Sequence, residues 1–544
     1  MPHSLRKSLA AVAGATADAE QERPTAALAR RGELVGELFN RHNLDLSRDL
    51  SDCLEKLTGV FHDCRSAFRA VVQLLIIFPG QLAFAAPTAI GRADDRAALS
   101  PSPKAAQSAT AVTLVGFAGM THLGIVSSVA TAARGYTVLG YDGNEELVAR
   151  VRRGELPVVE PGLDVLLAAN RGRIDFGTSL RELNRCDVVY IAADVPTDDE
   201  AESDLAPIAT LIEGVSCHLR NDAVLVLLCQ VPPGFTRRIA SVPHDRLIYQ
   251  VETLVFGNAV ERALNPERFI VGCADPTSPL PAPYREILNA FGCPVLPMRY
   301  ESAELAKISI NCCLVASITV ANTLAELSEL IGADWAEIVP ALRLDRRIGQ
   351  YSYLDPGLGV AGGNLERDLR TVLDLAAGTD ADVGVVHAWI TNSRHRRDWC
   401  WRVLRDHVLN SRRAAQIAVL GLAYKQNTRS TKNSPAIALL ELLETMGVRV
   451  RVHDPVVPSA IVPFATGCAD PLACAAGADA LVLATPWPEY RALRVEDLAQ
   501  VMAGRVLIDP FRLLSGEAAT AAGFAYHALG MPPPRQLETG FLPC

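Results

Sequence analysis

The feature that most constrains the fold is a long helical pattern in the middle of the chain. The segment ESAELAKISINCCLVASITVANTLAELSELIGA starts at Glu301 and contains no glycine or proline before its end. At about 30 residues it exceeds the roughly 8 to 20 residues of most helices in globular proteins. Helices of this length commonly join domains or pair subunits, so we expect folded domains before and after it.

Segments of alternating strand, turn and helix lie on both sides of this helix. Upstream, the apolar strands AVTLVGFA, YTVLGYD, DVVYIAA and AVLVLLCQV are separated by helical runs such as GMTHLGIVSSVATAARG. Downstream, the same alternation of strand, turn and helix begins again, with the strands QIAVLGLAY, MGVRVRVHDP and ALVLATP. Such alternation is typical of a parallel sheet with helices on both faces. The predicted fold class is α/β, with two Rossmann-like doubly wound domains joined by the long central helix.

We place the first Rossmann domain at residues 111–299, a central helical region at 300–400 and the second Rossmann-like domain at 413–530. Residues 1–110 differ from the rest. An alanine-rich, charged start is followed by an apolar run and then by AALSPSPKAAQSAT, a composition typical of a linker. We treat residues 1–110 as an N-terminal extension of unknown role.

The apolar run Val71–Pro87 is the candidate for a membrane segment at the sequence level. Two glutamines, a proline and a glycine interrupt it, whereas a spanning helix needs about 20 predominantly apolar residues. We therefore expect a buried or interfacial helix there and no membrane association.

Charge and cysteine spacing argue against several classes of function. The net charge of −9 gives no general attraction to nucleic acid or acidic membranes, so neither is an expected partner. The 13 cysteines are scattered, with no CxxC pair and no metal-ligand spacing, so we expect neither a metal site nor a disulfide framework. Cys186, Cys229 and Cys273 lie beside apolar runs and are expected to be buried thiols. Without a secretory signal, this pattern predicts a reducing, cytoplasmic location.

The turn between the first strand and the first helix carries a degenerate dinucleotide-binding motif. Gly119, Thr121 and Gly124 stand at the positions of a GxGxxG loop, and Asp142 closes the second strand. In this fingerprint the first glycine makes the tight turn, the helix N-terminus receives the pyrophosphate and the acidic residue binds the ribose hydroxyls. Asp142 favours NAD over NADP, and Thr121 limits close approach of the backbone to the pyrophosphate. The motif predicts NAD binding, against the alternative of an ordinary strand–helix turn.

The residues that follow carry a more specific pattern. GELPVVEPGL, at 154–163, resembles a signature of the UDP-glucose/GDP-mannose dehydrogenase family. The resemblance continues in order, over about residues 111–530, through these segments: VPTDDEAESDL, QVPPGFT, ETLVFGNAVERALNPERFIVG, SAELAKISIN, LDRRIG, DPGLGVAGGNLERD, AVLGLAYKQNTRSTKNSPA and ATPWPEYRAL.

This resemblance implies NAD in the first Rossmann domain, the nucleotide in the second and the sugar in the cleft between them. Members of the family oxidise the C6 alcohol of a nucleotide sugar to a carboxylate with two NAD, and they are obligate dimers or larger oligomers. The region at 300–400 would then carry both dimerisation and the catalytic loop. The expected partners are a nucleotide sugar, most simply a UDP sugar, and further copies of the chain.

The resemblance also implies catalytic roles. Lys307 and Asn311, one helical turn apart, match a pair that stabilises charge developing on the substrate oxygen. Glu252 matches a general base or water-orienting acid. Asp368 matches an acid that partners the catalytic residues.

Four further residues match ligand contacts of the family. Arg347 resembles an arginine that reaches the substrate of a neighbouring subunit, where its fork suits phosphate or carboxylate oxygens. Lys425 and Gly359 are assigned to the substrate. Lys432 is assigned to the cofactor. Outside the family context, either lysine could instead be a solvated surface charge.

The catalytic loop departs from the family's pattern. The family's cysteine lies in a GFGGSCFPKD-type loop, and counting back from Asp368 in GVAGGNLERD puts Asn364 at that position. The second oxidation in the family needs a thiolate nucleophile, which an amide cannot replace. Gln230 replaces a threonine thought to position water, and Arg367 replaces a lysine. We therefore expect that thioester chemistry is lost and that reversible alcohol–carbonyl chemistry survives.

Cys312 and Cys313 follow Asn311 on the long helix and are the thiols nearest in sequence to the catalytic pair. They fall at family positions occupied by alanine and phenylalanine. We therefore expect them to pack in the protein and not to replace the missing nucleophile.

The leading hypothesis is an NAD-dependent oxidoreductase acting on a CH–OH group of a nucleotide sugar, in polysaccharide or nucleotide-sugar metabolism, without a covalent thioester step. Three outcomes stay open: an aldehyde or ketone, an acid formed through the aldehyde hydrate, or an epimer formed by transient use of bound NAD. The alternative from another class is a catalytically silent sensor of nucleotide sugar or NAD. The presence of acid, base and cation together argues against the sensor.

Overall fold

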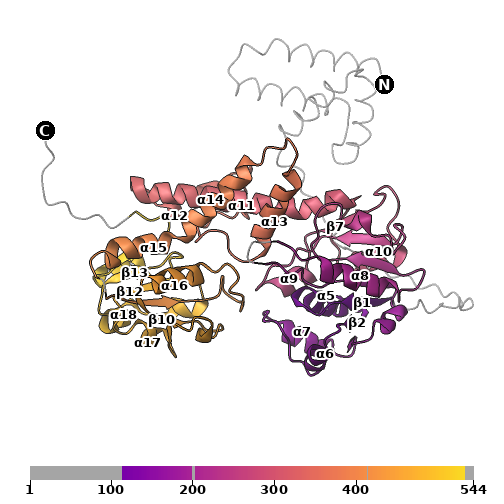
Figure 1. Cartoon of the computed structure of the whole chain (residues 1–544), viewed down its shortest axis with the longest axis horizontal. Helices are drawn as coiled ribbons and strands as arrows, with labels where there is room; N and C mark the ends of the chain where they lie inside the picture. The colour runs from indigo at the N-terminus through magenta and orange to yellow at the C-terminus, as the bar shows by residue number, and fades with distance from the viewer. Residues whose placement is uncertain (1–112, 199–201, 413, 533–544) are drawn as a thin grey trace, which may run out of the picture. The chain divides into compact units, whose positions relative to one another are not determined.

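A computed structural model describes residues 113–198, 202–412 and 414–532 (Figure 1). The N-terminal extension and the apolar run Val71–Pro87 lie outside the described residues.

The first sheet has eight strands in the order β3-β2-β1-β4-β5-β6-β7-β8. All neighbours are parallel except β6 and β7, which pair antiparallel, so the expected parallel sheet contains one antiparallel pairing. The chain crosses back from β6 to β7 through one short helix and continues parallel from β7 to β8. The strands are β1 (Leu114–Ala118), β2 (Thr137–Tyr141), β3 (Ile174–Gly177), β4 (Val188–Ile191), β5 (Val224–Leu227), β6 (Leu247–Gln250), β7 (Phe269–Cys273) and β8 (Val295–Arg299).

Helices cover both faces of this sheet, and each face has its own apolar core. One core joins the strands to α5, α7, α9 and α10, and the other joins them to η2, α8 and the start of α11. Because the central strands β4 and β5 are apolar at every position, they can be buried on both faces. The helical elements are α5 (His122–Ala133), α6 (Glu145–Arg152), α7 (Leu163–Ala169), η2 (Leu180–Arg185), α8 (Ala206–Ser216), η3 (Thr236–Arg238), α9 (Ala259–Leu264) and α10 (Ala282–Asn289).

The second sheet is parallel throughout, in the order β11-β10-β9-β12-β13-β14. Its strands are β9 (Gln416–Leu420), β10 (Arg449–His453), β11 (Thr466–Gly467), β12 (Ala480–Leu483), β13 (Val506–Ile508) and β14 (Ala525–His527). The surrounding helical elements are α15 (Trp399–Leu404), the π-helix η4 (Arg405–Leu409), α16 (Pro435–Thr445), η5 (Ser459–Ile461), α17 (Pro471–Ala475), η6 (Pro488–Ala492), α18 (Val495–Val501) and α19 (Gly516–Ala521).

Helix α11 (Tyr300–Ile331) is the long helix expected from the sequence, 32 residues without a break. Its first turns pack against β6, β7 and β8, and later turns contact α12 (Trp335–Leu344), α13 (Asn364–Ala376) and α14 (Gly384–Arg397). Near its end, the Glu329 carboxylate accepts hydrogen bonds from the backbone N–H of Gly530 (2.9 Å) and the indole N–H of Trp399 (3.1 Å). The helix therefore contacts both sheet-bearing regions.

By length and composition alone, α11 is also apolar enough to cross a membrane. Core helices of soluble proteins meet the same test. Here the helix buries polar side chains, among them Lys307 and Asn311, against other parts of the protein. Its composition is thus explained by packing.

Candidate active site

The turn after β1 has the geometry of a dinucleotide-binding loop. Gly119 has a φ of +100°, and a Cβ there would lie 2.8 Å from the backbone nitrogen of Ala193. A Cβ on Gly124 would lie only 1.7 Å from the carbonyl oxygen of Gly119. Both positions therefore require glycine, and together they let α5 start directly against the strand edge.

Asp142 and Thr121 complete this loop. Asp142 follows β2, and its carboxylate accepts hydrogen bonds from the backbone N–H groups of Met120 (2.8 Å) and Asn144 (2.9 Å). Thr121 precedes α5 with an extended backbone, and its hydroxyl accepts a hydrogen bond from the Asp194 N–H (2.9 Å). The threonine side chain is thus held toward the end of β4. This glycine turn, helix start and acidic residue fit an NAD molecule.

The equivalent turn in the second sheet has the same start and a different continuation. Gly421 also has a φ of +100°, and its N–H bonds the carbonyl of His453, as that of Gly119 bonds Tyr141. The Asp454 carboxylate, however, accepts hydrogen bonds from four backbone N–H groups and from the indole of Trp487. Because that carboxylate is saturated by the protein, it has little capacity left for a ribose, whereas Asp142 accepts two such bonds.

Lys307 and Glu252 form one half of a buried polar centre. Lys307 lies on α11 and is 8% exposed, and its Nζ is 3.3 Å from Glu252 Oε2. Glu252 follows β6, and its other carboxylate oxygen accepts a hydrogen bond from the backbone N–H of Leu254. Arg262 of α9 braces the same segment by donating to the carbonyl of Thr253 (2.7 Å). A cation and a carboxylate are therefore held together in a largely desolvated position.

Asn311, Asp368, Gln230 and Arg367 form the other half. Asp368 is 1% exposed, and its two oxygens accept hydrogen bonds from Asn311 Nδ2 (2.5 Å) and from the side-chain amide of Gln230. The guanidinium of Arg367 donates to the Gln230 carbonyl oxygen and lies 3.6 Å from Asp368. Burial raises the pKa of Asp368, and Arg367, Asn311 and Lys307 oppose that shift. The two halves are adjacent because Lys307 and Asn311 lie one turn apart on α11.

Asn364 opens helix α13, one turn before Asp368 and on the same side of the helix. Asn364 is exposed, whereas Asp368 is buried. The neighbouring thiols do not offer a nucleophile. Burial raises the pKa of Cys312 to about 11 and that of Cys229 to about 12. Neither has the lowered pKa of an activated thiolate.

Two buried carboxylates that the sequence argument did not single out support this centre. Glu304 is fully buried on α11 and accepts hydrogen bonds from the backbone N–H groups of Gly234 (2.5 Å) and Thr236 (2.9 Å), which fixes the loop after Gln230. Glu160 pairs with His122 at 2.7 Å and also accepts the N–H of Gly257 (2.8 Å). A glutamate between two prolines or on a long helix gives no sequence signal of such distant partners.

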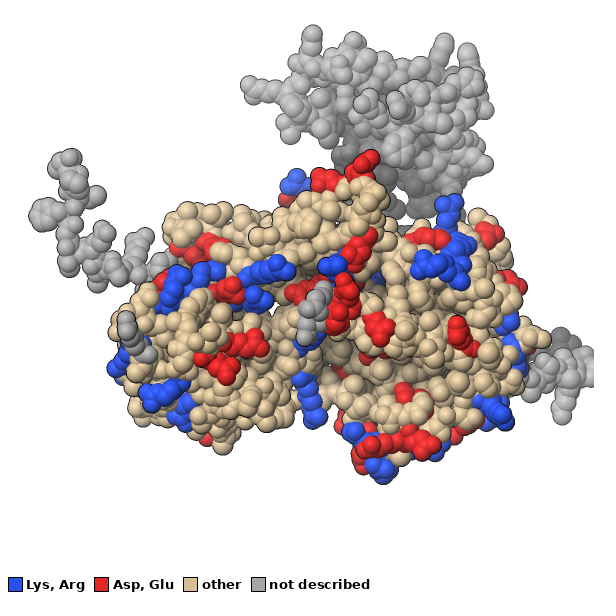
Figure 2. All heavy atoms as spheres, in the orientation of Figure 1, with Lys and Arg blue, Asp and Glu red and all other residues tan. Residues whose placement is uncertain are grey.

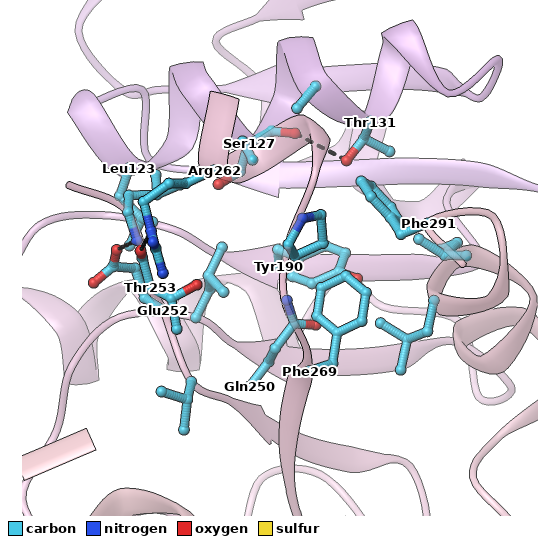
Figure 3. A pocket seen from close by; sticks show the side chains of 18 of the residues that line it. Leu123, Ser127, Thr131, Tyr190, Gln250, Glu252, Thr253, Arg262, Phe269 and Phe291 are labelled. Carbon is cyan, nitrogen blue, oxygen red and sulfur yellow. Dashed lines mark hydrogen bonds between the residues drawn. The ribbon is translucent and has the colours of Figure 1, made fainter. Parts of the chain in front are cut away.

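A cavity of about 70 Å³ lies beneath α5, against the strands of the first sheet (Figure 3). Tyr190, Gln250 and Phe269 line its floor, and at one end it reaches the segment that carries Glu252. Ligand pockets typically enclose about 300 to 1,000 Å³, so this cavity is too small for a dinucleotide. The cofactor therefore has to bind outside it, at the loop around Gly119.

Two lysines of the second Rossmann region reach the first. Lys425 Nζ donates to the carbonyl of Phe256 (2.8 Å), and burial lowers the pKa of Lys425 while Glu160 opposes the shift. Lys432 Nζ donates to the carbonyl of Asp198 (2.7 Å). Both ammonium groups lie where the two Rossmann regions meet, and their assignments to substrate and cofactor stay predictions.

The structure gives Gly359 a packing role. Its φ is +76°, and a Cβ there would lie 2.4 Å from the carbonyl oxygen of Ser393 on α14. This close approach alone requires glycine. Its assignment to the substrate stays a prediction.

Arg347 is not brought into this centre. Its side chain is 89% exposed and pairs with Asp345 at 2.6 Å, beyond the end of α12. An exposed arginine here is compatible with a contact to another subunit. On the face drawn in Figure 2, basic and acidic side chains are interspersed, so an anionic ligand depends on local cations and not on a broad field.

Comparisons with known proteins agree with this geometry. Residues 113–291 match the NAD binding domain of the UDP-glucose/GDP-mannose dehydrogenase family, residues 301–394 its central domain and residues 418–516 its UDP binding domain. The chain belongs to the UDP-glucose/GDP-mannose dehydrogenase family. It is thus an NAD-dependent oxidoreductase with a nucleotide-sugar substrate.

Relatives of this dehydrogenase match along almost their whole length. It is 29% identical to UDP-glucose 6-dehydrogenase TuaD of Bacillus subtilis over 439 residues, which cover 77% of this chain and 94% of that protein. It is 29% identical to a UDP-glucose 6-dehydrogenase of Pseudomonas aeruginosa, covering 76% and 96%. A solved UDP-glucose dehydrogenase from Pyrobaculum islandicum superposes with a TM-score of 0.69 at 26% identity, covering 79% of this chain and 100% of that one. These comparisons therefore extend over nearly the whole length of each relative, including its catalytic region.

Proposed function

We propose that this dehydrogenase oxidises the C6 alcohol of a UDP sugar to the aldehyde and releases it without a covalent intermediate. The observation that carries the proposal is the unequal state of the two halves of the polar centre. Lys307 and Glu252 are paired only loosely, at 3.3 Å. Both oxygens of Asp368 accept hydrogen bonds from protein side chains.

The first half supplies what an alcohol oxidation needs. NAD held at the loop around Gly119 would supply the hydride acceptor, and the alcohol proton must leave the oxygen. Glu252 is the carboxylate able to accept that proton, directly or through one water. Lys307 stabilises the negative charge that develops on the oxygen, in a position where low exposure strengthens the interaction. The products are the aldehyde, reduced cofactor and one proton.

The second half lacks what a further oxidation through a thioester needs. Such a step requires a sulfur that bonds the aldehyde carbon and a water that later cleaves the thioester. Asn364 provides an amide in place of sulfur. The side-chain amide of Gln230 donates a hydrogen bond to Asp368. It thereby occupies a place beside that carboxylate where a hydrolytic water would otherwise bind. These features favour release of a two-electron product over an acid or an epimer.

A UDP sugar is supported by the match of the second Rossmann region to a UDP binding domain and by the names of the relatives. Lys425 is the cation that would meet its phosphates or sugar hydroxyls, and Lys432 keeps its assignment to the cofactor. The contact of Lys425 with the backbone carbonyl of Phe256 would be exchanged for ligand oxygens.

We also propose that the enzyme is at least a dimer. The later turns of α11 carry a stripe of exposed apolar side chains at helical spacing: Val320, Leu324, Leu327 and Ile331, of which Ile331 is 76% exposed. A second copy of the chain would cover this stripe. Because the Arg347 side chain is exposed to solvent in a single copy, pairing of two copies would bring it to the partner's substrate.

Incubation of the full chain with NAD and a panel of UDP-, GDP- and CDP-sugars tests the reaction. We expect NADH formation with a UDP sugar, and a product that has lost two hydrogens, alone or as its hydrate, by mass spectrometry. Absence of NADH and of any altered sugar would instead support a binding protein without catalysis. A uronic acid formed through an enzyme-bound thioester would contradict the proposed role of the Asn364 loop.

A further inference from the structure

Glu160 is a buried carboxylate that contacts two functional parts of the first Rossmann region. It lies between α6 and α7, in the segment 154–163, and its side chain is fully buried. One carboxylate oxygen is 2.7 Å from His122 Nε2 and accepts the backbone N–H of Gly257 at 2.8 Å. The other oxygen accepts the backbone N–H of Ala259 at 3.2 Å. Both oxygens are therefore bonded to groups from distant parts of the chain.

His122 connects Glu160 to the cofactor loop. It is the first residue of α5 and directly follows Thr121. Its imidazole stacks on the Phe256 ring, with the ring centroids 4.0 Å apart and an angle of 27° between the ring planes. The start of α5 is thereby tied to the loop after β6 in two ways, through the Glu160 carboxylate and through the Phe256 ring.

The loop after β6 carries Glu252 near its start and leads into α9. The Glu160 carboxylate fixes the beginning of α9 by accepting the N–H of Ala259, the first residue of that helix. From the same helix, Arg262 donates to the carbonyl of Thr253 at 2.7 Å. Because Thr253 directly follows Glu252 in the chain, the position of α9 also sets the position of the Glu252 backbone.

The same loop has a second support, from the other Rossmann region. Lys425 Nζ donates to the carbonyl of Phe256 at 2.8 Å, and a Cβ on Gly257 would lie 3.0 Å from the Cβ of Asn427. Under the proposed function, Lys425 exchanges this carbonyl for ligand oxygens when a UDP sugar binds. The bonds of the loop to Glu160 involve no such ligand contact, so they can hold the loop in place while the sugar reacts.

We propose that Glu160 is a positioning residue for the oxidation, which fixes the base Glu252 relative to the start of α5, the end of the helix that this fold offers to the diphosphate of NAD. The inference rests on the proposed function, because Glu252 is the proton acceptor there. Proton and hydride leave the same CH–OH group, so the base and the hydride acceptor must both be placed to within about 0.5 Å. One carboxylate bonded to both elements holds them at a constant separation.

Glu160→Gln in the full chain tests this inference, because it keeps the size of the side chain and removes its charge and one acceptor oxygen. With the UDP sugar that wild type oxidises, we expect kcat for NADH formation to fall about 10- to 100-fold, as for displacement of a catalytic group by about 1 Å. Calorimetry with NAD should show an unchanged stoichiometry and a dissociation constant within about threefold of wild type, since the Gly119 turn and Asp142 are intact. A merely structural role would instead lower the number of chains that bind NAD.

Hydrogen–deuterium exchange without ligands tests the positional link itself. Glu160→Gln should speed deuterium uptake in residues 253–262, because the N–H groups of Gly257 and Ala259 lose part of their acceptor. Glu155→Gln, in the same segment, is the matched control. The Glu155 side chain is 52% exposed and pairs with Arg153 at the surface, so uptake, kcat and NAD binding should all stay as in wild type.

The inference is overturned if kcat of Glu160→Gln stays within about threefold of wild type, if NAD affinity falls as much as kcat does, or if deuterium uptake in 253–262 is unchanged. A wild type that forms no NADH with any UDP sugar would remove the proposed function and this inference together. If Glu160→Gln does not fold, His122→Phe repeats the measurements, since it keeps a ring against Phe256 and removes the imidazole partner of Glu160. There too, kcat should fall while the NAD stoichiometry is unchanged, and an unchanged kcat would overturn the inference.

Discussion

The two halves of the polar centre differ in what their carboxylates are bonded to. Glu252 contacts the Lys307 ammonium and one backbone N–H, which leaves the pair able to exchange a partner for substrate. Asp368 is held on both oxygens by the side chains of Asn311 and Gln230, with the Arg367 guanidinium beside them. The first arrangement suits proton and hydride transfer. The second is a closed network, which teaches that two carboxylates in one polar centre can differ in how much of their hydrogen-bonding capacity the protein already fills.

The largest expected effect is at Lys307. Lys307→Ala should lower the rate of NADH formation by about 10²–10³-fold, because the developing negative charge loses its cation. Steady-state kinetics with a UDP sugar measure this, and calorimetry with NAD checks that cofactor binding is retained. A loss below tenfold in a folded variant would mean that the Lys307–Glu252 half is not the reactive one.

A smaller loss is expected at Arg347, which lies outside both halves within one subunit. Arg347→Ala should raise KM for the sugar about tenfold, as for loss of a charge-assisted contact, and leave NAD affinity unchanged. An unchanged KM would exclude a contribution of Arg347 to the substrate site of a neighbouring subunit.

The dimer itself is tested at the apolar stripe of α11. Leu327→Lys should convert the protein to a lower-mass species in light scattering, whereas Val165→Lys, at a 68% exposed position on α7, should not. A wild-type protein that is monomeric under the same conditions would remove the basis for both predictions on subunit contacts.

An effect on stability is expected at Glu304, which supports the loop that carries Gln230. Glu304→Ala leaves the N–H groups of Gly234 and Thr236 without their acceptor, and should lower the free energy of unfolding by about 1–3 kcal/mol. Urea denaturation measures this. Asp204→Asn, in an exposed carboxylate, should change it by less than about 0.5 kcal/mol.

The smallest effect is expected at Asn364. Asn364→Ala should change the rate of NADH formation by less than about threefold, since the residue is exposed and takes no part in hydride transfer. Asn364→Cys should not by itself create a thioester pathway, because Gln230 and Arg367 still occupy the adjacent network. A loss of a hundredfold on Asn364→Ala would give this asparagine a direct role in the reaction.

The periodicity of apolar residues and the spacing of motif residues were sufficient to predict the main helices and strands and part of the site. The glycine-free run after Arg299 predicts α11, and the four-residue spacing of Lys307 and Asn311 predicts that they share one face of it. An apolar run followed by a glycine turn and then by a helical pattern predicts β1, α5 and β9. These features are local, so they are readable from neighbouring residues.

Features that depend on partners distant in the sequence could not be predicted from it. The antiparallel pairing of β6 with β7 is set by how the chain returns across the sheet, and neither strand's composition indicates it. The carboxylates of Glu160 and Glu304 each bond backbone groups dozens of residues away. For Gly359, the close contact with Ser393 already explains why glycine is required, so its assignment to the substrate stays a prediction.

The number of NADH molecules formed per sugar consumed tests the central claim most directly. Wild-type enzyme is incubated with excess NAD and limiting UDP-glucose, with NADH followed by absorbance and the remaining sugar by chromatography. Hydride transfer without thioester chemistry predicts one NADH per sugar and an aldehyde that a carbonyl reagent can trap. Two NADH per sugar, with the uronic acid as product, would contradict the account.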